Sequence, residues 1–523
     1  MLGQLTRSPA SLAGLRSSTQ LVARLSQSSR PVRLHRAITS AVSQADQEAT
    51  AASTAAAVQQ QQQSSSPDGT GTQQQAQQRK VGAAGPRTSS KEMVDTSPPR
   101  GTRDFYPEDM RLRNWLFGEW AAVAQLFGFE QFDVPVLESE ELFVRKAGEE
   151  ITDQLYNFQD KGGRRVALRP EITPSLARLV LGKGKGLALP AKWWIVGQCW
   201  RYERMTRGRR REHYQWNMDI VGVPGVEAEA ELLAAITTFF SRVGISAADV
   251  GIKVSSRKVL AAVLERYSVP PENFAQVCVI VDKLEKLPRD KVEAELAALG
   301  VSADATEGIL SALSCRSLDQ LGELLGPAGH DALGDLRQLW ALAAGYGFQE
   351  WLVFDASVEW LVSNAGVVRG LAYYTGVVFE GFDRAGQLRA ICGGGRYDKL
   401  LGTFGGEDVP CAGFGFGDAV IVELLKDKQL LPALTQQVDD VIMVMDESLR
   451  PAACSIAARL RAAGRRVDVI LEAKKMKWAF KHAERSGAAR LLLVGGGEWE
   501  RGAVAVKDLA SREQTEVPVD QLA

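Results

Sequence analysis

Apolar residues recur along this chain with two periods, one typical of helices and one typical of strands. From Leu112 to Phe127 they recur at three- and four-residue steps, which predicts an amphipathic helix, and residues 227–242 repeat the pattern. Two aromatic-rich stretches, 192–203 and 213–221, flank a polar loop and predict an antiparallel pair of strands. These elements predict an α+β region built on an antiparallel sheet.

Polar side chains fall on one face of each strand of this pair, because alternate residues of a strand share a face. Arg201 and Glu203 share a face of the first strand. Gln215, Asn217 and Asp219 share a face of the second. Charged groups on the face of a large sheet are costly to bury unless they meet a ligand, so this face is a candidate binding site.

Shorter elements complete the predicted region, which extends from about residue 99 to 430. Residues 132–137 predict a strand interrupted by Pro135, residues 164–168 predict another strand, and residues 175–181 predict a helix. Between about 250 and 347 the pattern is mixed and mostly helical, which predicts an inserted subdomain with no chemistry visible in its sequence.

A second folded unit is predicted at residues 438–523. Apolar runs at 441–445, 467–471 and 491–494 alternate with helical patterns at 451–463 and 473–485, which predicts a small parallel α/β domain. The second of these helices carries lysines around Trp478 and Phe480. Such lysines usually form a solvated face, but they also suit phosphates.

The N-terminal residues have a different composition. Residues 1–40 contain several arginines, many serines and no acidic residue, which predicts an organellar transit peptide, with a disordered tail as the alternative. Residues 41–98 are rich in Gln, Ser and Ala and have too little apolar area to fold, which predicts a disordered linker.

Composition excludes several classes of protein. A formal net charge of −1 argues against a uniformly basic surface, so any nucleic-acid contact must be local. No apolar run is long enough for a transmembrane helix. The six cysteines are scattered, with no CxxC spacing, and the chain has four histidines, so we expect no zinc site and no disulfide framework. Mg²⁺ carried by a nucleotide remains open.

Residues 368–380 combine an arginine with two tyrosines and a predicted strand. Arg369 precedes a glycine, and Tyr373 and Tyr374 precede the apolar run that starts at Val377. Such a stretch is an ordinary core strand in most proteins. Together, however, Arg201 and Arg369 could stabilise a transferring phosphoryl group, and no Walker loop or dinucleotide fingerprint is present. The residues alone indicate a nucleotide-dependent enzyme with a separate α/β domain.

Several motifs then carry a sharper resemblance. From about Arg100 to its end the chain resembles a class II aminoacyl-tRNA synthetase, specifically the histidyl-tRNA synthetase family. The matching stretches are 100–105 (the family's opening), 129–137 (motif 1, a dimer element), 201–219 (motif 2), 369–374 and 393–398 (both peculiar to histidine enzymes) and the C-terminal unit (an anticodon-binding domain). The resemblance implies ligation of L-histidine to tRNA(His) through histidyl-adenylate, with ATP and Mg²⁺ and no prosthetic group. It also implies a homodimer without a membrane anchor, acting in the chloroplast, the mitochondrion or both.

The resemblance also implies roles for individual residues. The catalytic cations would be Arg201 and Arg369, on either side of the α-phosphate. Histidine would be bound by Glu171, Thr173, Gln215, Asp219, Tyr373 and Tyr374, with Asp219 and Tyr374 at the imidazole. ATP would be bound by Arg201, Glu203, Arg209 and Arg369. The tRNA would be bound by Arg207, Arg210, Arg211, Lys474, Lys475 and Lys477.

Two positions depart from the family pattern. Ala372 stands where bacterial members have aspartate, and Val420 stands where motif 3 has an arginine that packs on the nucleotide. Losing that guanidinium is expected to weaken ATP binding unless another cation substitutes. A synthetase-like protein with impaired catalysis, which senses histidine or regulates a partner, is therefore the alternative. A general RNA-binding protein would explain the lysines but not the internal pocket.

Overall fold

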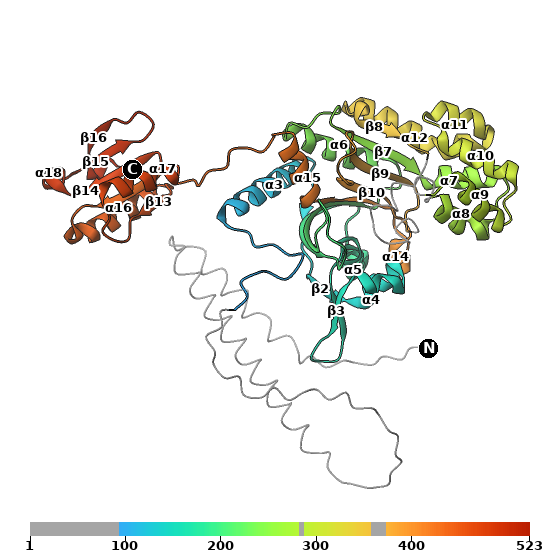
Figure 1. The fold of residues 1–523 in the computed structure, drawn as a ribbon, viewed down its shortest axis with the longest axis horizontal. Coiled ribbons are helices and arrows are strands. Elements are labelled where there is room, and N and C mark those ends of the chain that lie inside the picture. Colours follow the sequence, from blue (N-terminus) through green and yellow to red (C-terminus); the bar gives the residue numbers. More distant parts are fainter. Residues whose placement is uncertain (1–93, 282–286, 357–372, 523) are drawn as a thin grey trace, which may run out of the picture. The chain divides into compact units, whose positions relative to one another are not determined.

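The computed structural model describes residues 94–281, 287–356 and 373–522 (Figure 1). The predicted transit peptide, nearly all of the predicted linker, and Arg369 and Ala372 lie outside these residues. The interpretation of those segments therefore stays at the level of sequence.

The first folded region is organised around one large sheet. Its strand order is β1-β5-β6-β11-β10-β9-β7-β8, and every adjacent pair is antiparallel except β1–β5 and β7–β8. This confirms the predicted antiparallel sheet. The strands are β1 (Glu130–Gln131), β5 (Ala191–Trp200), β6 (Glu212–Val221), β7 (Val250–Ser256), β8 (Leu352–Phe354), β9 (Val377–Asp383), β10 (Cys392–Arg396) and β11 (Cys411–Gly417).

One face of this sheet carries the main hydrophobic core. The helices α3 (Pro107–Leu126), α6 (Glu227–Arg242) and α15 (Asp418–Asp427) contribute to it. The ring of Trp120 on α3 stacks on Trp216 of β6 at 5.8 Å, and Phe416 of β11 packs edge-on against Phe239 of α6. Large aromatic rings therefore fix the helices to the centre of the sheet.

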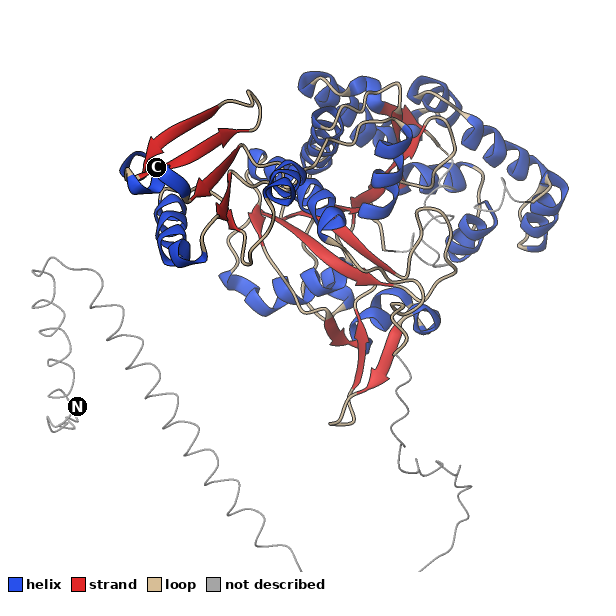
Figure 2. Cartoon of the chain, turned by 60° about the vertical axis from the view of Figure 1, so that its left-hand side comes forward, coloured by secondary structure: helices blue, strands red, loops and turns tan. Residues whose placement is uncertain are grey.

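The opposite face of the sheet meets smaller elements. These are α4 (Glu140–Ala147), α5 (Thr173–Lys183), α14 (Leu400–Thr403) and a three-stranded sheet of order β2-β4-β3, with β2 (Leu137–Ser139), β3 (Tyr156–Gln159) and β4 (Arg165–Leu168). Figure 2 shows this small sheet as a separate group of strands. A second apolar cluster, with Leu176, Tyr397 and Leu400, joins α5 and α14 to the main sheet.

The strand predicted at residues 132–137 is wrong. Phe132 still donates its N–H to Trp194 O at 3.0 Å, but strand pairing stops there. The Asp133 carboxylate accepts the Val134 N–H at 2.8 Å, and Pro135 has no N–H to donate. The segment is therefore irregular between β1 and β2.

The inserted helices are α7 (Arg257–Arg266), α8 (Phe274–Val281), α9 (Arg289–Ala298), α10 (Ala303–Ser314), α11 (Leu318–Leu325) and α12 (Pro327–Tyr346). α12 packs against α6 and α7, which joins the insertion to the core helices. The strand β7 precedes these helices and belongs to the main sheet, although the sequence pattern placed its residues in the insertion.

The C-terminal unit is a mixed sheet with helices on both faces. Its order is β13-β12-β14-β15-β16, parallel from β13 to β14 and antiparallel from β14 to β16. The parallel pairing predicted from the three apolar runs is confirmed, and the two antiparallel strands β15 and β16 were not predicted. Successive apolar residues of β12 enter clusters on opposite faces, which explains why its strands read as continuous apolar runs. The elements are β12 (Asp440–Val444), α16 (Arg450–Ala462), β13 (Val467–Val469), α17 (Met476–Arg485), β14 (Arg490–Val494), α18 (Gly496–Glu500), β15 (Ala503–Asp508) and β16 (Gln514–Pro518).

Candidate active site

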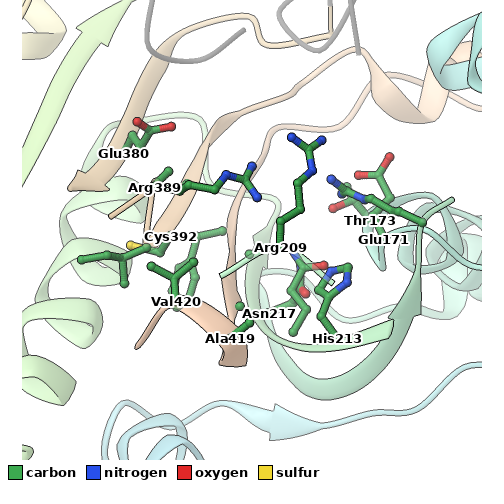
Figure 3. A pocket seen from close by; sticks show the side chains of 18 of the residues that line it. Glu171, Thr173, Arg209, His213, Asn217, Glu380, Arg389, Cys392, Ala419 and Val420 are labelled. Carbon is green, nitrogen blue, oxygen red and sulfur yellow. The ribbon is translucent and has the colours of Figure 1, made fainter. Parts of the chain in front are cut away.

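A cavity of about 290 Å³ is lined by residues of the main sheet and of the smaller elements beside it. It gathers most of the predicted site residues, although they come from segments far apart in sequence. Those that line it are Glu171, Thr173, Arg201, Glu203, Arg209, Arg210, Gln215, Tyr373 and Tyr374. Figure 3 shows several of their side chains around the cavity.

The floor of the cavity depends on the pairing of β6 with β11. Gly413 lies opposite Asp219, and Gly415 lies opposite Gln215. A Cβ at Gly413 would lie 2.0 Å from Asp219 Oδ1, and a Cβ at Gly415 would lie 1.8 Å from Gln215 Nε2. The side chains of Asp219 and Gln215 therefore occupy the space that side chains at Gly413 and Gly415 would otherwise fill. The alternate residues of β11, Phe414 and Phe416, belong to the hydrophobic core.

We call one side of the site the tyrosine end, formed by Glu171, Asp219, Tyr373, Tyr374 and Tyr397. Asp219 is 1% exposed, and the Tyr397 hydroxyl donates a hydrogen bond to its Oδ1. Its other oxygen, Oδ2, has no hydrogen-bond partner among the described residues. Burial raises the pKa of Asp219 to about 7, so this carboxyl group is a partly protonated acid near neutral pH.

Glu171 has the opposite shift because cations face it. Burial raises its pKa, but Lys146 and Arg201 lower it by more, and the net direction is downward. The Lys146 ammonium lies 2.6 Å from Glu171 Oε2 and 4.1 Å from the centre of the Tyr373 ring. Lys146 lies on α4, and no sequence pattern marked it as a site residue.

We call the other side the arginine end, formed by Arg201, Glu203, Arg209, Arg389 and Val420. Arg201 and Glu203 were predicted to lie on a strand, but β5 ends at Trp200 and both lie in the following loop. There Arg201 Nε donates to Pro170 O at 3.0 Å, and Arg209 forms an ion pair with Glu203. Glu203 Oε1 has no partner among the described side chains and main-chain groups.

Sequence reasoning missed further residues that line the cavity, among them His213, Glu380 and Arg389. Burial and then Arg201 lower the pKa of His213 to about 3, so its imidazole is neutral at physiological pH. Burial and then Arg209 lower the pKa of Arg389. His213 and Glu380 lie in the stretches 201–219 and 368–380, which the sequence singled out, but neither residue was selected there, and Arg389 lies in no such stretch.

Two family models match the chain: one described as histidyl-tRNA synthetase over residues 101–418, and one described as anticodon binding domain over residues 439–523. The chain belongs to the histidyl-tRNA synthetase family. It is 61% identical over 429 residues to the chloroplastic/mitochondrial histidine–tRNA ligase of Arabidopsis thaliana, covering 82% of this chain and 86% of that one. It is 39% identical to the histidine–tRNA ligase of Opitutus terrae, covering 81% and 96%.

A solved histidyl-tRNA synthetase from Nostoc sp. PCC 7120 has a similar fold. Its TM-score is 0.68 at 26% identity, and the match covers 82% of this chain and 98% of that one. The predicted fold class is thereby confirmed: a class II synthetase-like antiparallel sheet with a helical insertion, and a C-terminal α/β anticodon-binding domain.

Some residues that family resemblance selected lie outside the cavity. Arg207 forms ion pairs with Asp427 at 2.7 Å and with Glu423 at 3.4 Å. The Arg211 guanidinium lies 3.9 Å from the centre of the Tyr202 ring. Lys474 and Lys475 were placed on a helix, but α17 begins at Met476, so both precede it. These positions leave their predicted role toward tRNA untested.

Val420, at the position of the family's motif 3 arginine, lies on α15 and lines the cavity. Among the described residues no group of three or more His, Cys, Asp or Glu side chains could hold a metal ion. No described helix has the length and apolar character needed to cross a membrane.

Proposed function

We propose that this chain ligates L-histidine to tRNA(His) in two steps at the cavity. The histidine carboxylate attacks the α-phosphorus of ATP, which gives histidyl-adenylate and pyrophosphate, and the acyl group then passes to the terminal ribose of the tRNA. One observation carries this proposal: a single cavity joins an end lined by Glu171, Tyr373 and Tyr374 to an end with several guanidinium groups.

The tyrosine end binds histidine. Asp219 Oδ2 and Tyr374 bond the imidazole nitrogens, while Tyr373 closes the pocket. Glu171, Thr173 and Gln215 bind the α-ammonium group, and the low pKa of Glu171 keeps that carboxylate ionised for this task. A site that bonds both ring nitrogens would reject analogues without them by about 10⁴-fold or more, because its own polar groups would be left unpaired.

The arginine end binds ATP. Arg201 and Arg369 flank the α-phosphate and balance the charge that develops there. Arg209 and Glu203 hold the nucleotide's other groups. The partnerless Glu203 Oε1 and the Glu380 carboxylate are oxygen ligands of the kind that Mg²⁺ prefers, so they are fitted to receive the Mg²⁺ that accompanies ATP.

The chain acts in an organelle, the chloroplast or the mitochondrion or both, and forms a homodimer through residues 129–137. The organellar location is supported by the Arabidopsis relative and by an arginine-rich, acid-free N-terminus. The tRNA is bound by Arg207, Arg210 and Arg211 near the cavity and by Lys474, Lys475 and Lys477 in the anticodon-binding domain.

Histidine-dependent exchange of pyrophosphate into ATP tests the first step. The parent protein should catalyse exchange, and Arg369→Ala should slow it by about 10³-fold, the effect expected for removing a cation that stabilises transition-state charge. A well-folded parent without exchange would exclude the enzyme and favour the histidine-sensing alternative. Exchange by Arg369→Ala at the parent rate would exclude the role of Arg369 alone.

The lysines of the C-terminal unit are tested by a triple change, Lys474, Lys475 and Lys477→Glu. Replacing three cations near an anionic backbone should raise KM for tRNA in aminoacylation by about tenfold or more. Pyrophosphate exchange should stay within twofold of the parent, because it needs no tRNA. Equal losses in both assays would show that these lysines act on more than tRNA.

A further inference from the structure

We infer that Arg389 binds the β- and γ-phosphates of ATP. It would thereby supply a positive charge in place of the motif 3 arginine, whose position Val420 occupies. This inference rests on the proposed function, because it names a further residue for nucleotide binding at the same cavity. It concerns a side chain that no motif selected, from the segment that leads into β10.

The position of Arg389 is fixed by the sheet. Two residues further on, Ile391 donates its N–H to Gly381 O at 2.8 Å and is 2% exposed. This bond ties the segment to β9 at the edge of the cavity. A binding group held by the main sheet is preorganised, so little ordering is needed when a ligand arrives.

The side chain of Arg389 reaches the same space as Arg209. Figure 3 shows the two guanidinium groups approaching each other across the cavity, with Val420 beneath Arg389. They come from separate segments, since Arg209 lies in the loop between β5 and β6. The tip of that loop lies against Val420, because a Cβ at Gly208 would be 3.1 Å from Val420 Cγ2.

The described side chains of the cavity carry more positive than negative charge, which favours an anionic ligand. Among the described residues, its cationic side chains are Lys146, Arg201, Arg209, Arg210 and Arg389, and its carboxylates are Glu171, Glu203 and Glu380. Glu171 is paired with Lys146 and Glu203 with Arg209, while Glu203 and Glu380 also face Arg389. Burial lowers the pKa of Arg389 most, and the nearby guanidinium groups of Arg209 and Arg201 lower it further, against the opposite effect of Glu203 and Glu380. A bound polyanion removes this repulsion.

The positions of the side chains along the cavity indicate which phosphates of ATP Arg389 contacts. In Figure 3 Glu171 and Arg389 lie on opposite sides of Arg209. The histidine carboxylate and the α-phosphorus react where the two ends meet, so of Arg209 and Arg389 the guanidinium of Arg389 is further from the reacting atoms. It therefore meets the part of ATP that leaves as pyrophosphate.

Arg389→Gln tests the inference, with Arg389→Lys as a graded variant and Arg384→Gln as control. Arg384 is exposed and donates to Ala247 O at 2.7 Å, outside the cavity. We expect Arg389→Gln to raise KM for ATP in pyrophosphate exchange by about tenfold or more, the loss expected for charged hydrogen bonds. KM for histidine should stay within twofold, Arg389→Lys should be intermediate, and Arg384→Gln should match the parent.

Thermal melting with nucleotides gives a second, activity-independent readout. ATP should stabilise the parent more than AMP does, and Arg389→Gln should narrow this difference. A parent-like KM for ATP, or a difference between the ATP and AMP responses as large as the parent's, would overturn the inference. So would equal rises in both KM values together with a lower melting temperature of the ligand-free variant. If the parent catalyses no exchange, the proposed function fails, but the melting experiment still decides the role of Arg389.

Discussion

The two ends of the cavity bury charge in opposite ways. At the tyrosine end Asp219 is buried beside Tyr397 with no ion-pair partner among the described residues, and its pKa rises to about 7. At the arginine end the described guanidinium groups outnumber the described carboxylates, and burial together with Arg209 lowers the pKa of Arg389. At neutral pH the tyrosine end retains a proton on Asp219 that an aspartate in water would lose. The arginine end holds guanidinium groups close together, although they repel one another.

This difference matches the two substrates of the proposed function. An imidazole ring is recognised by neutral or weakly charged hydrogen-bonding groups, whereas a triphosphate needs fixed positive charge. Neither end is at its most stable without a ligand, because each contains polar groups that the surrounding protein satisfies incompletely. The two ends should therefore respond separately to substitution.

The largest difference between the effects on histidine binding and on ATP binding is expected from Gly413→Ala on β11. The new methyl group would lie 2.0 Å from Asp219 Oδ1, and Tyr397 leaves that short side chain little room to move. We expect KM for histidine to rise by about 100-fold or more, roughly 3 kcal/mol, with KM for ATP changed by less than about threefold. Steady-state pyrophosphate exchange measures both constants.

The matched control for this change is Gly417→Ala on the same strand. A Cβ at Gly417 has no heavy atom within 4 Å, so the control should leave KM for histidine nearly unchanged. If Gly413→Ala binds histidine as the parent does, Asp219 does not contact the amino acid.

The next effect concerns the stability of the ligand-free protein. The pKa of Asp219 is about 7 in the folded state, against 3.8 for an unperturbed aspartate. Its contribution to stability is therefore complete below about pH 4 and is lost as pH rises through 7. The stability difference between the parent and Asp219→Asn should shrink by about 3 kcal/mol between pH 5 and pH 8.

Urea unfolding at the two pH values, followed by tryptophan fluorescence, measures this difference. Trp216 lies on the same strand as Asp219 and is fully buried, so it reports on the relevant sheet. A parent and variant whose stabilities change in parallel with pH would contradict the raised pKa.

The smallest expected effects distinguish two arginines of the loop between β5 and β6. Arg207 pairs with Asp427 at an exposed site, whereas Arg209 lines the cavity. Arg207→Ala should change the free energy of unfolding by less than about 1 kcal/mol, as expected for an exposed ion pair, and should leave KM for ATP unchanged. Arg209→Ala should raise KM for ATP by about tenfold, and equal kinetic effects from the two variants would show that the loop acts as a whole.

Sequence patterns predicted the long elements well because their periodicity persists. The strands β5 and β6 each span ten residues, and α6 begins and ends at the predicted residues. The short strand β1 and the irregular residues after it were not predicted, since side-chain and proline effects at Asp133 and Pro135 override a two-residue pairing. The final hairpin of β15 and β16 was missed because no apolar run beyond residue 494 was interpreted.

The site residues divide in the same way. Glu171, Gln215 and Tyr373 belong to stretches with a family pattern, and the structure brings them into one cavity. Lys146 and Arg389 have no local signal. Lys146 meets Glu171, 25 positions away, only because α4 packs against α5, which begins just after Glu171, and Arg389 meets the loop at Arg209 only through strand order. Such residues emerge from topology rather than from sequence pattern.

The bare main chain of β11 also limits how the enzyme could be redesigned. Because Gly413 and Gly415 leave no side chain to trim, the amino-acid pocket cannot be enlarged from that strand, and any added atom fills it. Under the proposed roles, a version that accepts a different amino acid would have to change Asp219 on β6, or Tyr397, which supports Asp219. Of these two strands, only β6 therefore carries side chains whose substitution could change amino-acid specificity.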